Sequence, residues 1–289
     1  MFLELIRKLG WRKMLMIPLA LAIVSSFLIL FVGFPLSLEF SSGTLISYRG
    51  LENKPDPLSV ERLLRGIIPG EVKAEIITDP STGKFGLDIQ TTAVLGENEE
   101  NQVIATLSSL GLKNPSITPL EPALGRTYRR QAVEAILIAS IAIGLCMLFV
   151  YKRKIVLLTV PCVLADLLAA LGGMCLTKTP LSLASLAGLL LLLGYGVDTN
   201  ILLTTYALKR FEGEPEERIS SAMKTGFTIT LTTLFTMLSV NVFVSNPSLD
   251  ELSTVLVFGL AADLLNTWFL NAAILLWHLS KRKTYHVAL

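Results

Sequence analysis

Charged residues are scarce in this chain: Lys, Arg, Asp and Glu together make up 17% of its 289 residues. Soluble domains carry about 25%, whereas 52% of the residues here are hydrophobic. This balance excludes an ordinary soluble protein and indicates an integral membrane protein. The net charge is only +2, and no basic patch lies outside the loop ends, so a nucleic-acid partner is not expected.

Histidine and cysteine are also few. Both histidines, His278 and His286, lie near the C-terminal end, which argues against a histidine-based proton relay. The three cysteines fall within apolar runs, as small core residues do, so the sequence predicts neither a disulfide framework nor a metal site. The polar part of the chain has no nucleophile–base pair, metal-ligand cluster or phosphate loop. We therefore expect no enzyme, no catalytic residue and no cofactor.

Several apolar runs are long enough to cross a bilayer, which takes about 20 apolar residues. The six predicted spans cover residues 14–34, 132–150, 155–176, 181–208, 226–245 and 253–279. The first run follows basic residues, as in a signal peptide. However, it is longer than a typical signal-peptide core and no A-x-A-like cleavage site follows it, so we expect it to remain as a span.

Lysine and arginine are concentrated in four clusters: before the first run, between the second and third, between the fourth and fifth, and after the sixth. With six spans, all four clusters fall on one side, and such clusters are typical of the cytoplasmic side. We expect a multi-pass protein of the cell membrane with both termini in the cytoplasm. The predicted parts are an N-terminus with span one (1–35), an external domain (36–131), a five-helix bundle (132–280) and a cytoplasmic tail (281–289).

The predicted external domain shows both strand and helix periodicity. Alternating apolar and polar residues predict strands, and apolar residues at helical spacing predict helices. In chain order, the expected elements are a strand at 38–48, a helix at 58–68, strands at 71–78 and 84–91, a helix at 98–110 and a strand at 116–120. This β-α-β-β-α-β order predicts a ferredoxin-like α+β domain between spans one and two.

Three carboxylates, Asp166, Asp198 and Asp263, lie near the middle of apolar runs. A charge at this depth costs at least roughly 2.5–3.5 kcal/mol on insertion scales, so such residues are functional candidates by default. No Lys, Arg or His lies at the same depth in this chain. Either the carboxyl groups are protonated or a partner chain supplies the cation, and both arrangements suit proton handling. The alternative is a structural role as hydrogen-bonding groups between spans.

Asp198 is the most informative of the three because it lies in the short polar stretch Gly-Tyr-Gly-Val-Asp-Thr-Asn, residues 194–200. The two glycines before it, Gly194 and Gly196, allow another helix to approach closely. The sequence therefore predicts an intramembrane polar site, with proton coupling as its proposed role. Its residues are Asp166, Asp198, Thr199, Asn200, Asp263 and Asn266.

The order of one span, an external domain and then five spans resembles half of a transporter of the resistance–nodulation–division (RND) superfamily. Segments 34–45, 125–135 and 194–203 resemble motifs of one of its members, the SecD/SecF protein-export family. The second resembles the segment that leads into span two, and the third resembles the fourth-span motif. The first resembles the motif that begins the external domain, with Glu39, Phe40, Gly43 and Thr44 in place.

The fourth-span segment departs from the usual bacterial pattern of this family. Asp198 stands at the position of an Asn, and Thr199 at the position of an Asp. Thr205 and Tyr206 replace an Asp-Arg pair at the cytoplasmic end. The chain is therefore similar to archaeal-type members, and the bacterial proton path does not transfer to it residue by residue.

The resemblance implies a subunit of the Sec protein-export machinery that uses the proton-motive force to promote translocation across the membrane. It also implies a SecD-like subunit, the Sec translocon, the exported polypeptide and membrane lipid as partners. Two other functions stay open. One is half of an RND-type transporter of small molecules or lipids. The other is a membrane scaffold without transport, in which the three carboxylates are structural.

Overall fold

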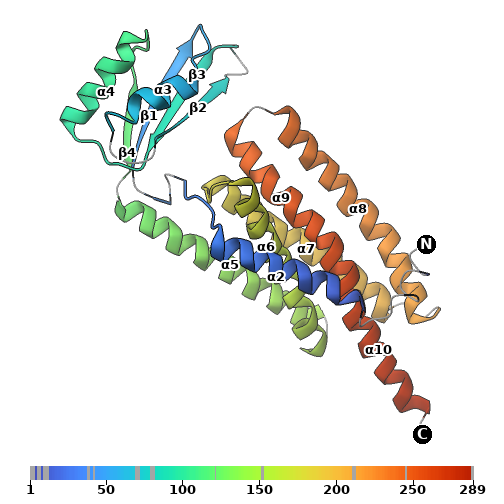
Figure 1. Ribbon diagram of the computed structural model, residues 1–289. Helices are drawn as coiled ribbons and strands as arrows, with labels where there is room; N and C mark the ends of the chain where they lie inside the picture. The colour runs from blue at the N-terminus through green and yellow to red at the C-terminus, as the bar shows by residue number, and fades with distance from the viewer. Residues whose placement is uncertain are drawn as a thin grey trace.

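A computed structural model gives the structure of the chain. It describes residues 13–37, 40–41, 43–68, 72–78, 82–120, 122–150, 153–209, 213–244 and 246–287, together with Glu4 and Lys8. Figure 1 shows a small α/β domain at one end of a bundle of long helices, with the C-terminus at the far end of the bundle.

The bundle consists of long apolar helices. Within the described part of the chain, five helical segments are long and apolar enough to cross a membrane, so this is a polytopic helical membrane protein. They are α5 (Pro122–Val150), α6 (Arg153–Thr177), α7 (Leu183–Lys209), α8 (Pro215–Phe243), and the continuous segment formed by α9 (Pro247–Leu265), η1 (Asn266–Asn271) and α10 (Ala272–Val287).

Helix α2 (Met16–Phe31) is apolar but shorter than these five. It packs along α6, where Ser25 lies so close to Gly172 that a Cβ at the glycine would be 2.8 Å from the Ser25 Cβ. The first of the six predicted spans, at residues 14–34, therefore stays a prediction. Two other boundaries differ from the predicted ones: α5 begins inside the range given to the external domain, and α10 continues beyond residue 280.

Helix α9 is the centre of the bundle and packs against α6, α7 and α8 (Figure 1). Its start is fixed by Asn246, whose side-chain Oδ1 accepts the Leu249 N–H at 3.2 Å, and by Pro247 in the first turn. Close packing depends on glycine, since a Cβ on Gly259 would lie 2.3 Å from Leu192 of α7. Small residues that let helix backbones approach are the usual means of packing in membranes.

The α/β domain is a four-stranded antiparallel sheet with two helices on one face. Its elements are β1 (Gly43–Leu51), α3 (Pro57–Leu64), β2 (Val72–Thr78), β3 (Phe85–Thr91), α4 (Glu97–Ser109) and β4 (Ser116–Leu120). The strand order is β2-β3-β1-β4. Ile46 pairs with Ile89 on one side and Ile117 on the other, and the apolar side chains of the strands pack against Val60 and Val103 of the two helices.

The connection between domain and bundle is tightly packed. The segment after α2 forms two backbone hydrogen bonds with the α6–α7 loop: Ser37 N–H donates to the Leu181 oxygen at 3.0 Å, and Leu181 N–H donates to the Pro35 oxygen at 2.8 Å. Phe40 is fully buried, and the Arg129 guanidinium of α5 donates to its carbonyl oxygen. We call these contacts the neck.

The described part of the motif predicted to begin the external domain, which includes Phe40, Gly43 and Thr44, lies at this neck. Gly43 is the first residue of β1, so the strand begins five residues later than the predicted position 38. The buried Thr44 hydroxyl donates to the Ala93 oxygen and accepts the Leu95 N–H, both at 3.1 Å. Glu39 lies outside the described residues. The motif thus fixes the first strand to the loop before α4.

Candidate functional site

A cluster of buried polar side chains lies inside the bundle, where α6, α7, α9 and η1 pack together. We call it the polar cluster. Each of its side chains is at most 7% exposed. Its members are Asp166 of α6, Thr199 and Asn200 of α7, Asp263 of α9, and Asn266, Thr267 and Asn271 of η1.

Asp166 is held by an amide from the neighbouring span. The Asn266 Nδ2 donates to its Oδ1 at 2.7 Å, across 100 residues of sequence. Its second oxygen, Oδ2, has no hydrogen-bond partner within the described structure. The backbone of α7 comes close to this oxygen, since a Cβ on Gly196 would lie 3.1 Å from it. Gly196 therefore gives the free carboxylate oxygen room between α6 and α7.

Asp263 is held by two hydroxyl groups. Its Oδ1 accepts from Thr199 of α7 at 2.8 Å and from Thr267, one turn later in its own span, at 2.7 Å. Its Oδ2, like that of Asp166, has no partner among the described residues. Each of the two carboxyl groups therefore has one oxygen that accepts hydrogen bonds and one oxygen without a partner among the described residues.

Two asparagines complete the polar cluster where α7 meets η1. The Asn271 Nδ2 donates to the Asn200 Oδ1 at 2.5 Å, and the Asn200 Nδ2 donates to the Gly196 backbone oxygen at 2.6 Å. Both asparagines are fully buried. The interaction ties α7 to η1 and fixes the rotation of α7 about its own axis.

The π-helical segment η1 supplies three members of the polar cluster. A π-turn contains an extra residue, so it changes the direction in which the following side chains point, and such turns occur frequently at functional sites. Here Asn266 reaches α6, Thr267 reaches Asp263, and Asn271 reaches α7. The widened segment lets one span present polar groups to two neighbouring helices.

The polar cluster contains acidic and neutral groups without a cation. None of the ion pairs formed by the described residues involves Asp166 or Asp263. An ionised carboxylate buried without a counter-charge costs several kcal/mol. Two carboxyl groups, each with one unpartnered oxygen and no neighbouring cation, form an arrangement that can bind protons. The loss of one proton would then leave an uncompensated negative charge in the bundle.

Asp198 lies apart from the polar cluster. It is exposed on the outer face of α7, one turn after Gly194, at which a Cβ would meet no atom within 4 Å. Leu191, on the same face, is 45% exposed. The structure therefore brings five of the predicted residues together and leaves the sixth on an open face; the five are Asp166, Thr199, Asn200, Asp263 and Asn266.

Thr267 is a member of the polar cluster that the sequence analysis did not select. The signal was its spacing of four residues from Asp263, which places both on one face of an ordinary helix. Asn271, four residues further on, follows the same spacing. No pattern in the sequence indicates the π-turn that directs these two side chains to different partners.

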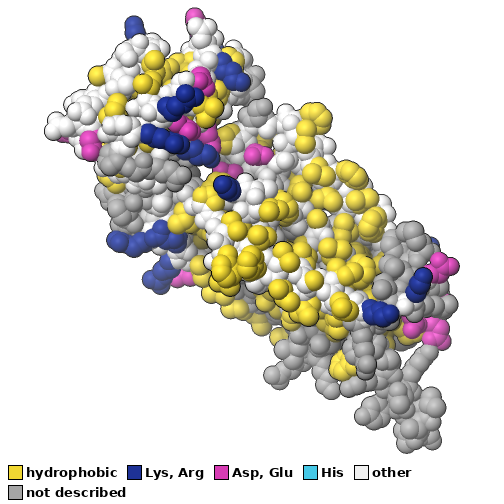
Figure 2. Space-filling view, in the orientation of Figure 1, with side chains coloured by type: hydrophobic (Ala, Val, Ile, Leu, Met, Phe, Trp, Pro, Cys, Tyr) yellow, Lys and Arg dark blue, Asp and Glu magenta, His cyan; other side chains and the backbone are white. Residues whose placement is uncertain are grey.

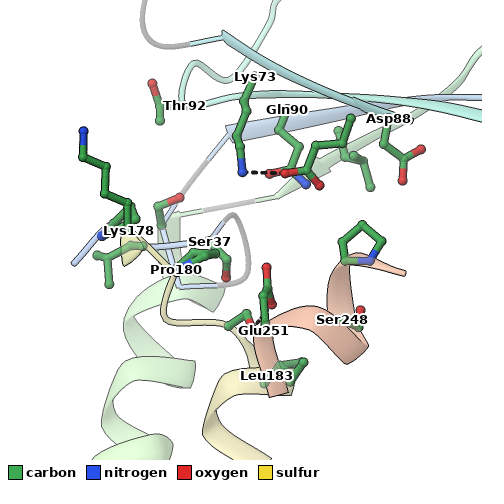
Figure 3. A pocket seen from close by; sticks show the side chains of 18 of the residues that line it. Ser37, Lys73, Asp88, Gln90, Thr92, Lys178, Pro180, Leu183, Ser248 and Glu251 are labelled. Carbon is green, nitrogen blue, oxygen red and sulfur yellow. Dashed lines mark hydrogen bonds and ion pairs between the residues drawn. The ribbon is translucent and has the colours of Figure 1, made fainter. Parts of the chain in front are cut away.

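A second feature is a cleft between the α/β domain and the bundle, with a volume of about 530 Å³. Figure 3 shows strand side chains, among them Lys73 and Gln90, on one side and residues at the ends of α7 and α9 on the other. Lys73 pairs with Glu75 at 2.5 Å, and the Ser182 hydroxyl donates to Glu251 at 2.5 Å. The third acidic group of the lining, Asp88, pairs with Arg49. All three carboxylates of the cleft thus have partners, so the polar cluster is the stronger candidate site.

Replacing Asp263 by alanine is expected to destabilise the protein by about 1–3 kcal/mol, because the buried Thr199 and Thr267 hydroxyls lose their shared acceptor. The measurement is thermal unfolding of the purified chain in mild detergent. Asp263→Asn is the control, since its Oδ1 still accepts from both hydroxyls, and it should unfold within about 1 kcal/mol of wild type. Equal losses for the two variants would contradict this account of the hydrogen bonds.

Comparison with known proteins identifies related sequences and structures. Residues 101–281 match the family described as "Protein export membrane protein SecD/SecF, C-terminal". "Protein-export membrane protein SecF" of Thermococcus gammatolerans is 32% identical over 283 residues, which cover 96% of this chain and 89% of that protein. The protein of the same description from Methanothermobacter thermautotrophicus is 34% identical over 281 residues and is covered to 94% on both sides.

A solved structure shares the fold. The crystal structure of SecDF from Thermus thermophilus, described as a translocon-associated membrane protein, superposes with a TM-score of 0.71 at 20% sequence identity. The match covers 93% of this chain but only 38% of the SecDF chain. This chain therefore has the fold of one part of that larger protein.

Proposed function

This chain belongs to the SecD/SecF family and serves protein export as its SecF-type subunit, and we propose that it uses the proton-motive force in doing so. The observation that supports the proposal is the pair of buried carboxyl groups, Asp166 and Asp263, each with one oxygen satisfied and one open. A SecD-like subunit is its partner in the membrane. The exported polypeptide and the Sec translocon are the other proposed partners.

The energy available from a gradient suits this role. Moving one charge across 100 mV yields roughly 2.3 kcal/mol. Driving a two-state domain from 1:99 to 99:1 takes about 5.5 kcal/mol, so a few protons are sufficient. The neck connects the α/β domain directly to the α6–α7 loop, and these two helices carry Asp166 and Thr199. A movement of α6 or α7 that follows a change in the polar cluster would therefore reach the domain through the neck.

The face of α7 that carries Asp198 is proposed to bind the SecD-like subunit. A carboxylate at the middle of a membrane helix is costly where it faces lipid. Asp198 is exposed here, and the open space beside Gly194 has room for another helix. A partner span at this face would shield the carboxylate from lipid and supply a hydrogen-bonding or cationic group, so Asp198 would act in coupling between the two subunits.

The proposed topology has six spans, with α2 as the first and both termini in the cytoplasm. The α/β domain, whose elements run from β1 to β4, would then be a ferredoxin-like domain outside the membrane. The packing of α2 along α6 through Ser25 and Gly172 supports a sixth helix in the same layer. The basic residues Lys152, Arg153 and Lys154, which fall between α5 and α6 in the sequence, support this orientation, because such clusters are typical of cytoplasmic loops.

A crosslinking experiment tests the proposed pairing. In native membranes, a cysteine replacing Gly194 is expected to form an adduct with the SecD-like chain, because the space at this position is open and lies on the face of Asp198. Val133→Cys on α5 is the control, since that side chain is 58% exposed on a different helix. A self-dimer alone at position 194, or an equal yield of heteromeric adduct at both positions, would overturn the pairing.

A further inference from the structure

Arginines are concentrated where α5 leaves the α/β domain. Arg126, Arg129 and Arg130 lie within the first turns of the helix. Arg129 is used in the neck, where it donates to the Phe40 oxygen. Arg130 pairs with Glu134 at 2.7 Å, but its side chain is still 82% exposed. Arg126 is exposed, and no acidic group among the described residues pairs with it.

An apolar stripe continues from these arginines along the same face of α5. It is formed by residues four or seven positions apart, which lie on one face of a helix: Val133, Leu137, Ile141 and Leu148, which are between 43% and 62% exposed. Gly144 lies in the stripe, and a Cβ there would meet nothing within 4 Å. The helix contacts the bundle through a different face, with Ala132 and Met147 buried.

Figure 2 shows Lys and Arg side chains gathered where the domain meets the hydrophobic surface of the bundle. One face of α5 thus presents guanidinium groups at the end near the domain, followed along the helix by exposed apolar side chains. Guanidinium groups recognise phosphate through paired hydrogen bonds. An anionic phospholipid matches this arrangement, because its phosphate headgroup can meet the arginines while its acyl chains lie along the apolar stripe.

We propose that this face of α5 is a binding site for an anionic phospholipid, with the headgroup phosphate between Arg126 and Arg130 and an acyl chain along the stripe that begins at Val133. The charge excess favours this occupant over a partner helix. Among the described residues at this end of α5, three arginines are accompanied by one carboxylate, Glu134, at a boundary where the proposed orientation predicts few positive charges. The site uses none of the groups proposed for coupling, so it does not depend on that proposal.

Electron spin resonance measures the lipid preference directly. The purified full chain is placed in phosphatidylcholine vesicles, and the association of spin-labelled phosphatidylglycerol is compared with that of spin-labelled phosphatidylcholine. Because basic residues near the surface attract anionic lipid, the wild type is expected to prefer phosphatidylglycerol at least about twofold. The double variant Arg126→Gln, Arg130→Gln is expected to show no preference. The control Arg62→Gln, Arg65→Gln removes two exposed arginines from the α/β domain and should keep the preference.

Three results would overturn the proposal: no preference in the wild type, an unchanged preference in the α5 double variant, or loss of the preference on addition of inorganic phosphate alone. The last would indicate a free-anion site. The double variant Arg126→Lys, Arg130→Lys is the control for misfolding, because it keeps the charge but loses the paired hydrogen bonds. Its preference for phosphatidylglycerol should lie between that of wild type and that of the Gln variant. A SecD-like adduct at Val133→Cys would show that a protein occupies the face and would also overturn the proposal.

Discussion

Asp198→Asn is expected to abolish the stimulation of export while leaving the complex assembled. Asparagine keeps the size of the side chain and its ability to form hydrogen bonds, but it cannot release a proton. Asp198 is exposed on the face proposed to meet the SecD-like subunit, so it can exchange protons without disturbing the polar cluster. The measurement is the rate of export of a model precursor into membrane vesicles, with co-purification of the SecD-like chain as the check on assembly.

Asp198→Glu is the matched control, since it retains a titratable carboxyl group and should retain most of the stimulation. Asp263→Asn and Asp166→Asn should fold normally, because an asparagine at either position preserves the acceptor oxygen used by its neighbours. Each is expected to reduce the stimulation only in part, because the other buried carboxyl group can still bind a proton. Export by Asp198→Asn at the wild-type rate, with its response to the proton gradient intact, would assign this carboxylate a structural role.

Gly125→Ala is expected to disrupt the neck and destabilise the protein by about 1–3 kcal/mol, the usual range for overpacking. A Cβ at this position would lie 2.1 Å from the backbone oxygen of Ser41. A backbone atom cannot move aside as a flexible side chain can, so α5 and the segment before β1 must separate. Thermal unfolding in detergent and protease cleavage near the start of β1 would report the change.

Gly144→Ala is the control within the same helix, since a Cβ there meets no atom within 4 Å. Alanine is favoured over glycine in a helix interior by roughly 0.5–1 kcal/mol, so this variant should be as stable as wild type or slightly more stable. Equal thermal shifts for the two variants would show that the contact between Gly125 and Ser41 does not carry the stability assigned to the neck.

Local periodicity predicted the strands of the α/β domain well. The alternating segments 71–78 and 84–91 form β2 and β3, Val72–Thr78 and Phe85–Thr91, because alternation between two faces is a local property of the chain. The start of β1 was predicted five residues too early. Phe40 is apolar, as in a strand, but it is buried in the neck, and this contact with α5 cannot be read from neighbouring residues.

The depth of the polar residues could be predicted, but their direction could not. Asp166, Asp198 and Asp263 are near the middle of apolar runs, and this is visible in the sequence. Helix α7 is apolar on all sides, so no amphipathic pattern shows which face is buried. Only packing against α6 and α9 decides that Thr199 and Asn200 point inward while Asp198 points outward.

The alternative functions differ from the proposal in what they require. Half of an RND-type efflux transporter would need a second half for small molecules or lipids, whereas the relatives covered over most of their length are described as protein-export proteins. A scaffold without transport predicts that Asp166, Asp198 and Asp263 can all be replaced by asparagine together without loss of export. That triple variant therefore separates a scaffold from a coupling subunit.

The most direct test of the account is the dependence of export stimulation on the proton gradient in vesicles that contain the translocon, the SecD-like subunit and this chain. We expect stimulation of a translocation intermediate to rise with the imposed gradient and to vanish when an uncoupler removes it. Vesicles without this chain should show the same low rate in both conditions. Stimulation that persists at full strength in the presence of the uncoupler would contradict the claim that the chain couples export to the proton-motive force.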